Sequence, residues 1–234
     1  MNCLITGATS GIGLALAKVF AKKGYNLILV SSSLQRLEST KVLLEKETNV
    51  NIHIYETDLS ELHAGENLFE AIMADGLTVD ILVNNAGFGL VGATEEIDAD
   101  QDRKMMILNM ISVVSLCKCF LPGMVQRGFG KILNIASTGA FQPGPYTATY
   151  FASKAFVLSY SKAIRYEAKQ KGVQVCTICP GATKTGFFVR EGVKTPARTM
   201  SAEGVAKYAY NCLKKNKAIG IPGIINRLMQ LAPE

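Results

Sequence analysis

Three side chains in the second half of the chain have types and spacing suited to proton transfer. Tyr150 and Lys154 are four residues apart, so they share one face of a helix, and Ser137 precedes Tyr150 by thirteen residues. An ammonium group near a phenol stabilises the phenolate and lowers a pKa that is ordinarily about 10. A serine hydroxyl in the same place can hold the oxygen of a carbonyl group. Tyrosine and lysine occur at this spacing on many helices, so the interpretation depends on the surrounding elements.

Near the N-terminus, a glycine-rich segment from Thr6 to Gly13 lies between an apolar run and a helical pattern. Glycines allow a tight turn and a close approach to a pyrophosphate, which the N–H groups and dipole of a helix start attract. The spacing GxxxGxG differs from the general GxGxxG fingerprint, and the chain has no GK[ST] of a Walker loop. Its position between the first strand and the first helix predicts a dinucleotide site. The loop residues expected at the cofactor are Gly7, Thr9, Ser10, Gly11, Ile12 and Gly13.

The choice between NADP and NAD depends on residues after the second and third apolar runs. Ser31 and Ser32 stand where a carboxylate usually binds a free ribose 2′-hydroxyl. A carboxylate would repel a 2′-phosphate and hydroxyls would not, so the sequence favours NADP over NAD. Arg36, one turn into the next helix, is either a phosphate ligand or a solvated side chain. Asp58, followed by Leu59, either accepts a hydrogen bond from an adenine amine or caps the next helix.

Hydrophobic periodicity places these residues in alternating strands and helices. Strands are expected at 1–6, 26–30, 51–56, 80–83, 131–136, 173–179 and 218–221. Helices are expected at 12–23, 33–46, 60–74, 100–126, 150–171 and 201–215. Continuous apolar strands joined by helices predict a doubly wound (Rossmann) α/β fold, in which helices cover both faces of a parallel sheet. Its ligand crevice lies at the carboxyl ends of the strands, where the candidate residues stand.

The composition excludes several classes of protein. The chain has 234 residues, of which 48% are hydrophobic and 19% charged; this fits one domain over 1–234 and excludes a disordered chain. Its net charge is +6, but the basic residues are scattered, so no nucleic-acid surface is expected. Six cysteines behind an N-terminus without a leader pattern indicate a cytoplasmic protein with reduced thiols, and two histidines make a metal site unexpected. The apolar stretch Met105–Cys117 has 13 residues and includes Asn109, so no membrane span is expected.

The order and spacing of the motifs resemble the short-chain dehydrogenase/reductase family over nearly the whole chain. The motifs that carry the resemblance are Thr6–Gly13, Asp58, Asn84–Gly87, Asn109, Ser137, the Tyr150–Lys154 pair and Pro180–Gly181. The resemblance implies a seven-stranded parallel sheet and NAD(P)-linked interconversion of alcohols and carbonyl compounds. The second half of the chain is most similar to 3-oxoacyl reductases and hydroxysteroid dehydrogenases.

The resemblance also assigns roles to individual residues. It implies that Tyr150 is the general acid/base and that Lys154 holds the nicotinamide ribose and lowers the pKa of the tyrosine. Ser137 would orient the carbonyl group, and Asn109 would anchor a water in the proton relay.

Further cofactor contacts are implied after the fourth and sixth strands. The residues concerned are Asn85, Ala86, Gly87, Pro180, Gly181, Thr183 and Thr185. Thr185 matches the threonine that binds the nicotinamide carboxamide. The stretch at about 186–200 resembles the substrate lid of the family, with Phe187 and Phe188 as candidate apolar wall residues.

The helices at 100–126 and 150–171 are apolar on nearly every face, so a homodimer or homotetramer through them is expected.

Three alternative functions stay open at this point. A catalytically silent dinucleotide-binding regulator would not need the intact Ser137, Tyr150, Lys154 and Asn109. A sugar-nucleotide epimerase would normally have a longer chain and another glycine spacing. A serine hydrolase would need a GxSxG elbow, which the sequence lacks.

Overall fold

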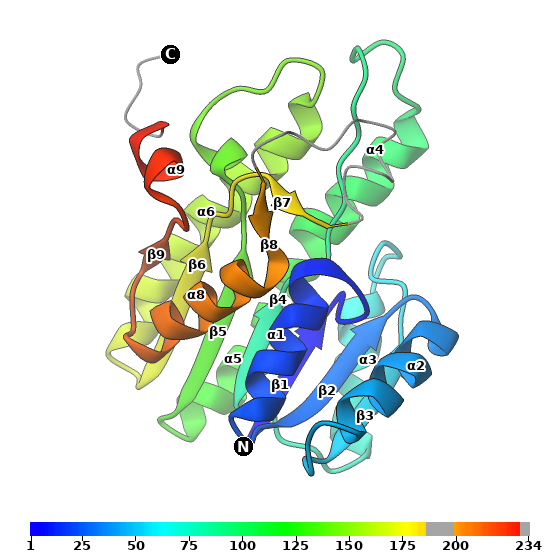
Figure 1. The fold of residues 1–234 in the computed structure, drawn as a ribbon, viewed down its shortest axis with the longest axis vertical. Helices are drawn as coiled ribbons and strands as arrows, with labels where there is room; N and C mark the ends of the chain where they lie inside the picture. The colour runs from blue at the N-terminus through cyan, green and yellow to red at the C-terminus, as the bar shows by residue number, and fades with distance from the viewer. Residues whose placement is uncertain (186–198, 230–234) are drawn as a thin grey trace.

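A parallel sheet of seven strands forms the centre of the protein (Figure 1). The computed structural model describes residues 1–185 and 199–229. The strands of the sheet are β1 (Asn2–Thr6), β2 (Asn26–Ser31), β3 (Ile52–Glu56), β4 (Ile81–Asn84), β5 (Gly130–Ile135), β6 (Val173–Ile178) and β9 (Ile219–Gly220). They lie in the order β3-β2-β1-β4-β5-β6-β9, and every neighbouring pair is parallel. The predicted doubly wound α/β fold is confirmed, and its strand order reverses between β1 and β4.

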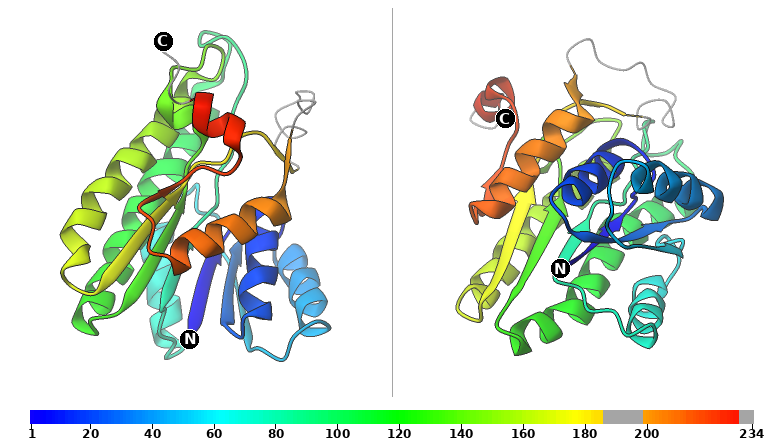
Figure 2. Two further views of the ribbon diagram at one scale, coloured as in Figure 1. Left: turned by 60° about the vertical axis from the view of Figure 1, so that its left-hand side comes forward. Right: turned by 60° about the horizontal axis from the view of Figure 1, so that its bottom comes forward.

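Helices cover both faces of this sheet (Figure 2). The helices are α1 (Gly11–Lys22), α2 (Leu34–Glu45), α3 (Ala64–Ala74), α4 (Ala99–Met106), α5 (Ser112–Gln126), α6 (Ala148–Lys169), α8 (Ala202–Lys214) and α9 (Ile224–Met229). Two short helical segments, η1 (Ile107–Ile111) and η2 (Thr138–Phe141), and a small parallel pair, β7 (Thr183–Lys184) with β8 (Met200–Ser201), complete the described elements. Helices α1, α2 and α8 pack on one face, and α3, α5 and α6 pack on the other.

The alternation of side chains along each strand divides the core into two layers. Cys3 and Ile5 of β1 belong to the cluster under α1, α2 and α8, whereas Leu4 belongs to the cluster under α3, α5 and α6. Because both faces are buried, each strand needs apolar residues at successive positions. This explains why the strands are continuous apolar runs in the sequence.

The segment after β3 corrects one predicted boundary. A helix was expected at 60–74, but α3 begins at Ala64. Asp58 Oδ1 accepts hydrogen bonds from the backbone N–H of Ser60 (3.0 Å) and from its hydroxyl (2.6 Å), which makes a turn. His63 has a φ of 63°, and this left-handed residue prevents a helix from running through it.

The helix expected at 100–126 is continuous but not regular. Residues Ile107–Ile111 form a π-helical turn between α4 and α5, with Asn109 at its centre. Such turns are rare in proteins, and those that occur often lie at functional sites. Periodicity cannot show one extra residue in a turn of an otherwise helical pattern, so the sequence predicted the helix without this feature.

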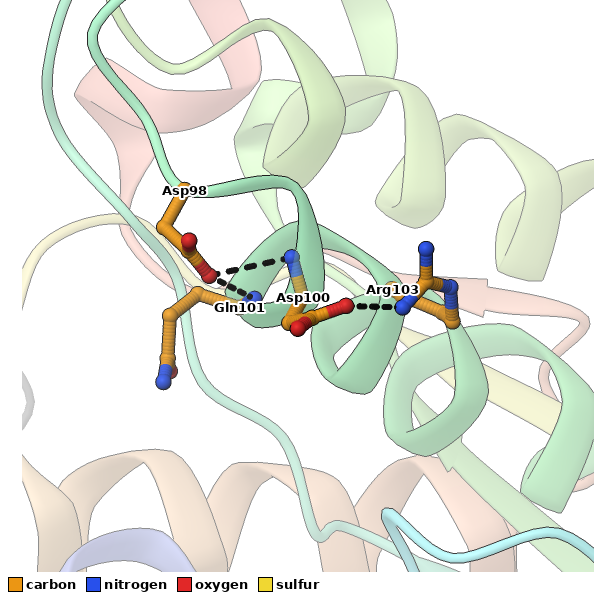
Figure 3. Close-up of polar contacts among 4 residues, drawn as sticks. All are labelled: Asp98, Asp100, Gln101 and Arg103. Carbon is orange, nitrogen blue, oxygen red and sulfur yellow. Dashed lines mark hydrogen bonds and ion pairs between the residues drawn. The ribbon is translucent and has the colours of Figure 1, made fainter.

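Asp98 fixes the start of this long helix (Figure 3). Its Oδ1 accepts hydrogen bonds from the backbone N–H groups of Asp100 and Gln101, at 3.0 Å each. Asp100 pairs in turn with Arg103 one turn later. The cap satisfies N–H groups that have no partner within the helix, so it sets where the helix towards Asn109 begins.

By length and composition alone, the stretch Ala99–Gln126 could cross a membrane. It has 28 residues with a mean hydropathy of 1.8 in its most apolar window, and 44% of that window is buried inside the described fold. This is weak evidence for a membrane span, because a helix that covers a sheet passes the same test. Here α5 packs on the sheet and against α3.

Candidate active site

A cavity of about 560 Å³ lies at the carboxyl ends of the strands. The loops after β1, β2, β3, β4, β5 and β6 all contribute to its wall. The predicted residues that line it are Gly7, Thr9, Ser10, Gly11, Ile12, Ser31, Ser32, Asp58, Leu59, Asn85, Ala86, Gly87, Ser137, Tyr150, Lys154, Pro180, Gly181, Thr183 and Thr185. Gly13 and Asn109 were also predicted, but neither lines the cavity.

The glycine loop after β1 has a shape that larger residues would not allow. Gly7 has a φ of 64°, in the left-handed region that favours glycine. A Cβ on Gly13 would lie 2.1 Å from the carbonyl oxygen of Gly7 and 2.5 Å from Nδ2 of Asn85. Gly13 therefore allows α1 and the loop to pack closely, although it does not itself line the cavity. The first N–H groups of α1 lack helical partners, so the loop fits a pyrophosphate.

The loops after β1 and β4 are tied together where the strand order reverses. Nδ2 of Asn85 donates to the carbonyl oxygens of Thr6 (2.9 Å) and Gly7 (3.3 Å). The Thr6 hydroxyl accepts from the backbone N–H groups of Asn85 (3.0 Å) and Ala86 (2.9 Å). Asn85 therefore holds the glycine loop as well as lining the cavity. Sequence reasoning included Thr6 in the glycine-rich segment but gave it no role, because only these contacts reveal one.

At the β2 end of the cavity, hydroxyl groups replace the usual carboxylate. Ser31 Oγ lies 3.1 Å from Thr9 Oγ1, and Ser32 and Arg36 line the same wall. Asp58 lines the cavity, but it does not cap the next helix as expected, because the N-cap of α3 is His63 and Asp58 makes the turn at Ser60 instead. Its contact with an adenine amine stays a prediction.

Tyr150 and Lys154 meet on the first turns of α6. Nζ of Lys154 lies 5.6 Å from the centroid of the Tyr150 ring and donates to the carbonyl oxygen of Ile135 (3.3 Å). Burial lowers the pKa of Lys154 to about 8, because the charged form is poorly solvated there. At pH 7 the Lys154 amine is still protonated in most molecules, so it supplies a positive charge beside the phenol of Tyr150.

Ser137 stands at the end of β5 and caps η2. Its Oγ accepts a hydrogen bond from the backbone N–H of Gly139 (3.1 Å). The hydroxyl hydrogen can then be donated to an oxygen in the cavity. The next residue, Thr138, donates its N–H to the carbonyl oxygen of Pro180 (2.9 Å), which joins the loops after β5 and β6.

Asn109 is 1% exposed and connects two parts of the site from behind. Its Nδ2 donates to the carbonyl oxygen of Phe88 (2.9 Å) and to Oγ of Ser153 (3.1 Å), and its Oδ1 accepts from the N–H of Phe88 (3.3 Å). The Ser153 hydroxyl donates to the carbonyl oxygen of Tyr150 (2.7 Å). The side chain thus holds the loop after β4 against α6, and its role in a water relay stays a prediction.

A profile of the short chain dehydrogenase family matches residues 1–194. The chain belongs to the short-chain dehydrogenase family. It is therefore related to proteins that are named as reductases and dehydrogenases.

The chain is 36% identical to a very-long-chain 3-oxoacyl-CoA reductase of Anas platyrhynchos over 183 residues, 76% of this chain and 58% of that protein. It is 34% identical to 17-beta-hydroxysteroid dehydrogenase type 3 of Homo sapiens over 210 residues, 89% of this chain and 66% of that protein. It thus spans less than two thirds of either relative. A solved short-chain dehydrogenase from Sphingobium yanoikuyae in complex with NADPH is 30% identical, with a TM-score of 0.91 over 98% of this chain and 91% of that one.

The turn after β6 closes the site of this short-chain dehydrogenase. Thr183 donates its hydroxyl to the carbonyl oxygen of Gly181 (2.9 Å), and Thr185 packs beside Gly11. The pairing of β7 with β8 brings the two ends of the following stretch together. The predicted lid at 186–200, including Phe187 and Phe188, lies outside the described residues except for 199 and 200. The lid and the extent of the domain stay predictions.

Several cavity residues of this short-chain dehydrogenase were not predicted. They are mainly apolar or small. They include Leu108 of the π-helical turn and Phe151 of α6. A hydrophobic side chain next to a motif reads as core in a sequence, so no signal distinguishes these residues.

Proposed function

We propose that this short-chain dehydrogenase uses NADPH to reduce a ketone or aldehyde to an alcohol, or catalyses the reverse reaction, with Tyr150 as general acid/base. The observation that supports this most is the presence of Ser137, Tyr150 and Lys154 in one cavity with the glycine loop. A silent regulator would not require these groups to converge.

The residues of the cavity fit a dinucleotide on structural grounds. Gly13 allows α1 to approach Gly7, since any Cβ there would overlap its carbonyl oxygen. The first turn of α1 would hold the pyrophosphate, and Thr185 the nicotinamide. When bound, the nicotinamide supplies or accepts a hydride. Everything else in the reaction is done by side chains of this chain.

In the proposed reduction, Ser137 donates its hydroxyl hydrogen to the carbonyl oxygen and so holds it near Tyr150. The phenol of Tyr150 then gives its proton to the same oxygen as negative charge develops there. Lys154 stabilises the phenolate that remains, because its ammonium group lies near the ring. In the oxidation the proton returns by the same route.

The preference for NADPH is supported by the wall at the β2 end of the cavity. Ser31 and Ser32 carry no charge that would repel a 2′-phosphate, and Arg36 lines the same wall. The similar protein from Sphingobium yanoikuyae is described in complex with NADPH.

A homodimer or homotetramer through the helices predicted at 100–126 and 150–171 is part of the proposal. Ile111 of η1 is 45% exposed and Phe156 of α6 is 41% exposed, and a second subunit would cover them. The cytoplasmic location stays a prediction.

The test replaces Tyr150 with Phe. We expect Tyr150→Phe to abolish turnover of ketones and aldehydes while NADPH still binds, because the ring remains and only the hydroxyl group that donates the proton is lost. Titrations of NADPH and NADH, followed by nicotinamide fluorescence, measure cofactor binding in the same preparation. Retained turnover in this variant would refute the role of Tyr150, and tighter binding of NADH than of NADPH would refute the cofactor preference.

A further inference from the structure

Phe151 follows Tyr150 directly on α6 and lines the same cavity. Its ring packs edge-on against that of Tyr150, with centroids 6.0 Å apart and an interplanar angle of 70°. A bulky ring beside the proton donor limits the space for a substrate group on that side. Neither the family motifs nor the proposed mechanism gives this residue a role.

Two glycines of the loop between β5 and α6 hold the ring. A Cβ on Gly139 would lie 3.1 Å from three carbons of the Phe151 ring, and a Cβ on Gly144 would lie 2.4 Å from its Cγ. We call Gly139 and Gly144 the glycine seat. Neither glycine has a positive φ, so backbone conformation does not require glycine at these positions. Positions 139 and 144 instead need glycine because the Phe151 ring occupies the space that a Cβ would take.

The contact at Gly144 is not one that the ring can easily avoid. Cγ of Phe151 is one bond from Cβ, so it moves away only if the side chain rotates about χ1. Both glycines are buried, and the carbonyl oxygen of Gly144 accepts hydrogen bonds from the backbone N–H (3.0 Å) and the hydroxyl (3.2 Å) of Thr147 at the start of α6. A methyl group at Gly144 therefore either displaces the loop or turns the ring.

The glycine seat is also connected to Ser137. The N–H of Gly139 donates to Oγ of Ser137, so the ring that packs on Gly139 lies behind the group that orients the hydroxyl. A shift of this loop moves Ser137 relative to Tyr150. Cofactor contacts at the glycine loop lie on other strands and are not touched.

We propose that Phe151, held by the glycine seat, determines the size of the substrate group accepted beside Tyr150 and positions the loop that carries Ser137. This inference rests on the proposed function. It concerns the bulk of the ketone rather than its chemistry, and it names the residue that sets the limit.

The experiment compares the full-length wild type with Phe151→Ala, Gly144→Ala and the double variant. The probes are acetophenone and benzophenone, which differ by one phenyl ring in place of a methyl group. We expect Phe151→Ala to raise the ratio of kcat/KM for benzophenone over acetophenone by about tenfold or more, since it removes a ring of similar volume. Tyr166→Ala, which removes a ring that is 86% exposed on the same helix, is the matched control and should leave the ratio unchanged.

Gly144→Ala alone should lower Tm by several degrees and lower kcat/KM for both ketones, with the NADPH dissociation constant unchanged. In the double variant the added methyl group meets no ring, so Tm should be no lower than in Phe151→Ala alone. Additive losses of Tm would overturn the glycine seat, and an unchanged ketone ratio in Phe151→Ala would overturn the limit on size. If Phe151→Ala does not fold, Phe151→Leu provides the same comparisons with a smaller change of volume.

Failure of the proposed function would look different. If the wild type binds NADPH but reduces neither ketone nor any aldehyde, the proposed reduction of carbonyl compounds is refuted. The Tm values of the four proteins still decide whether the ring and the glycine seat are coupled, because that measurement needs no substrate.

Discussion

The buried ammonium group of Lys154 should make the cofactor-free protein less stable at neutral pH than an uncharged side chain would. The side chain is 6% exposed, and burial lowers its pKa from 10.5 to about 8. Between these two pH values the unfolded chain binds more protons than the folded one, so the stability of the wild type rises with pH. Lys154→Met removes this dependence, because methionine has a similar length and no charge.

The expected magnitude follows from the two pKa values. The ionisation of Lys154 destabilises the folded state by about 3 kcal/mol at pH 7, about 2 kcal/mol at pH 9 and about 0.5 kcal/mol at pH 10.5. The advantage of Lys154→Met over the wild type should therefore shrink by about 3 kcal/mol between pH 7 and pH 10.5. Differences in packing between the two side chains add a constant that does not change with pH.

The assay is urea unfolding of both proteins without cofactor at several pH values from 6.5 to 10.5. Lys162→Met is the matched control, because Lys162 is an exposed lysine on the same helix; its difference from the wild type should not vary with pH. Lys154→Met should also be inactive, since it removes the charge beside Tyr150. A stability difference for Lys154→Met that stays constant over this range would refute the argument that burial lowers the pKa.

Three further predictions concern the glycine loop, the residue after β2 and the start of α2. Gly13→Ala should weaken NADPH binding at least tenfold in a fluorescence titration, because its Cβ would lie 2.1 Å from the Gly7 carbonyl oxygen; unchanged affinity would show that α1 can move away without loss. Ser32→Arg should tighten NADPH binding and leave NADH binding unchanged in parallel titrations, and equal affinities before and after would place Ser32 away from the 2′-phosphate. Ser33→Ala should lower the unfolding free energy by about 1 kcal/mol in urea, because Ser33 Oγ accepts from the N–H of Arg36 at the start of α2, and no loss would mean that this cap contributes nothing.

Local patterns were enough for the fold and for most of the site. Apolar runs and helical periods depend on neighbouring residues, so they predicted the alternation of strands and helices that the sheet confirms. The glycine loop and the Tyr150–Lys154 pair are also local, and parallel strands bring their ends to one edge of the sheet. Most of the predicted cofactor residues line the cavity for this reason.

The contacts of several site residues depend on segments that are distant in the sequence. The role of Asn109 in a water relay stays a prediction, and the structure adds that its side chain contacts Phe88 and Ser153, which lie 21 and 44 residues away in the sequence. Gly13 was expected at the cofactor; it does not line the cavity, and the turn brings the Gly7 carbonyl oxygen next to it.

The sequence by itself determined the sheet, the order of the motifs and the groups available for chemistry, because these follow from residue types at short spacing. Tertiary structure alone decided which side chains touch, and therefore that burial lowers the pKa of Lys154 and that two glycines hold Phe151. Burial and close packing arise from segments that meet only after folding, so no local pattern in the chain records them.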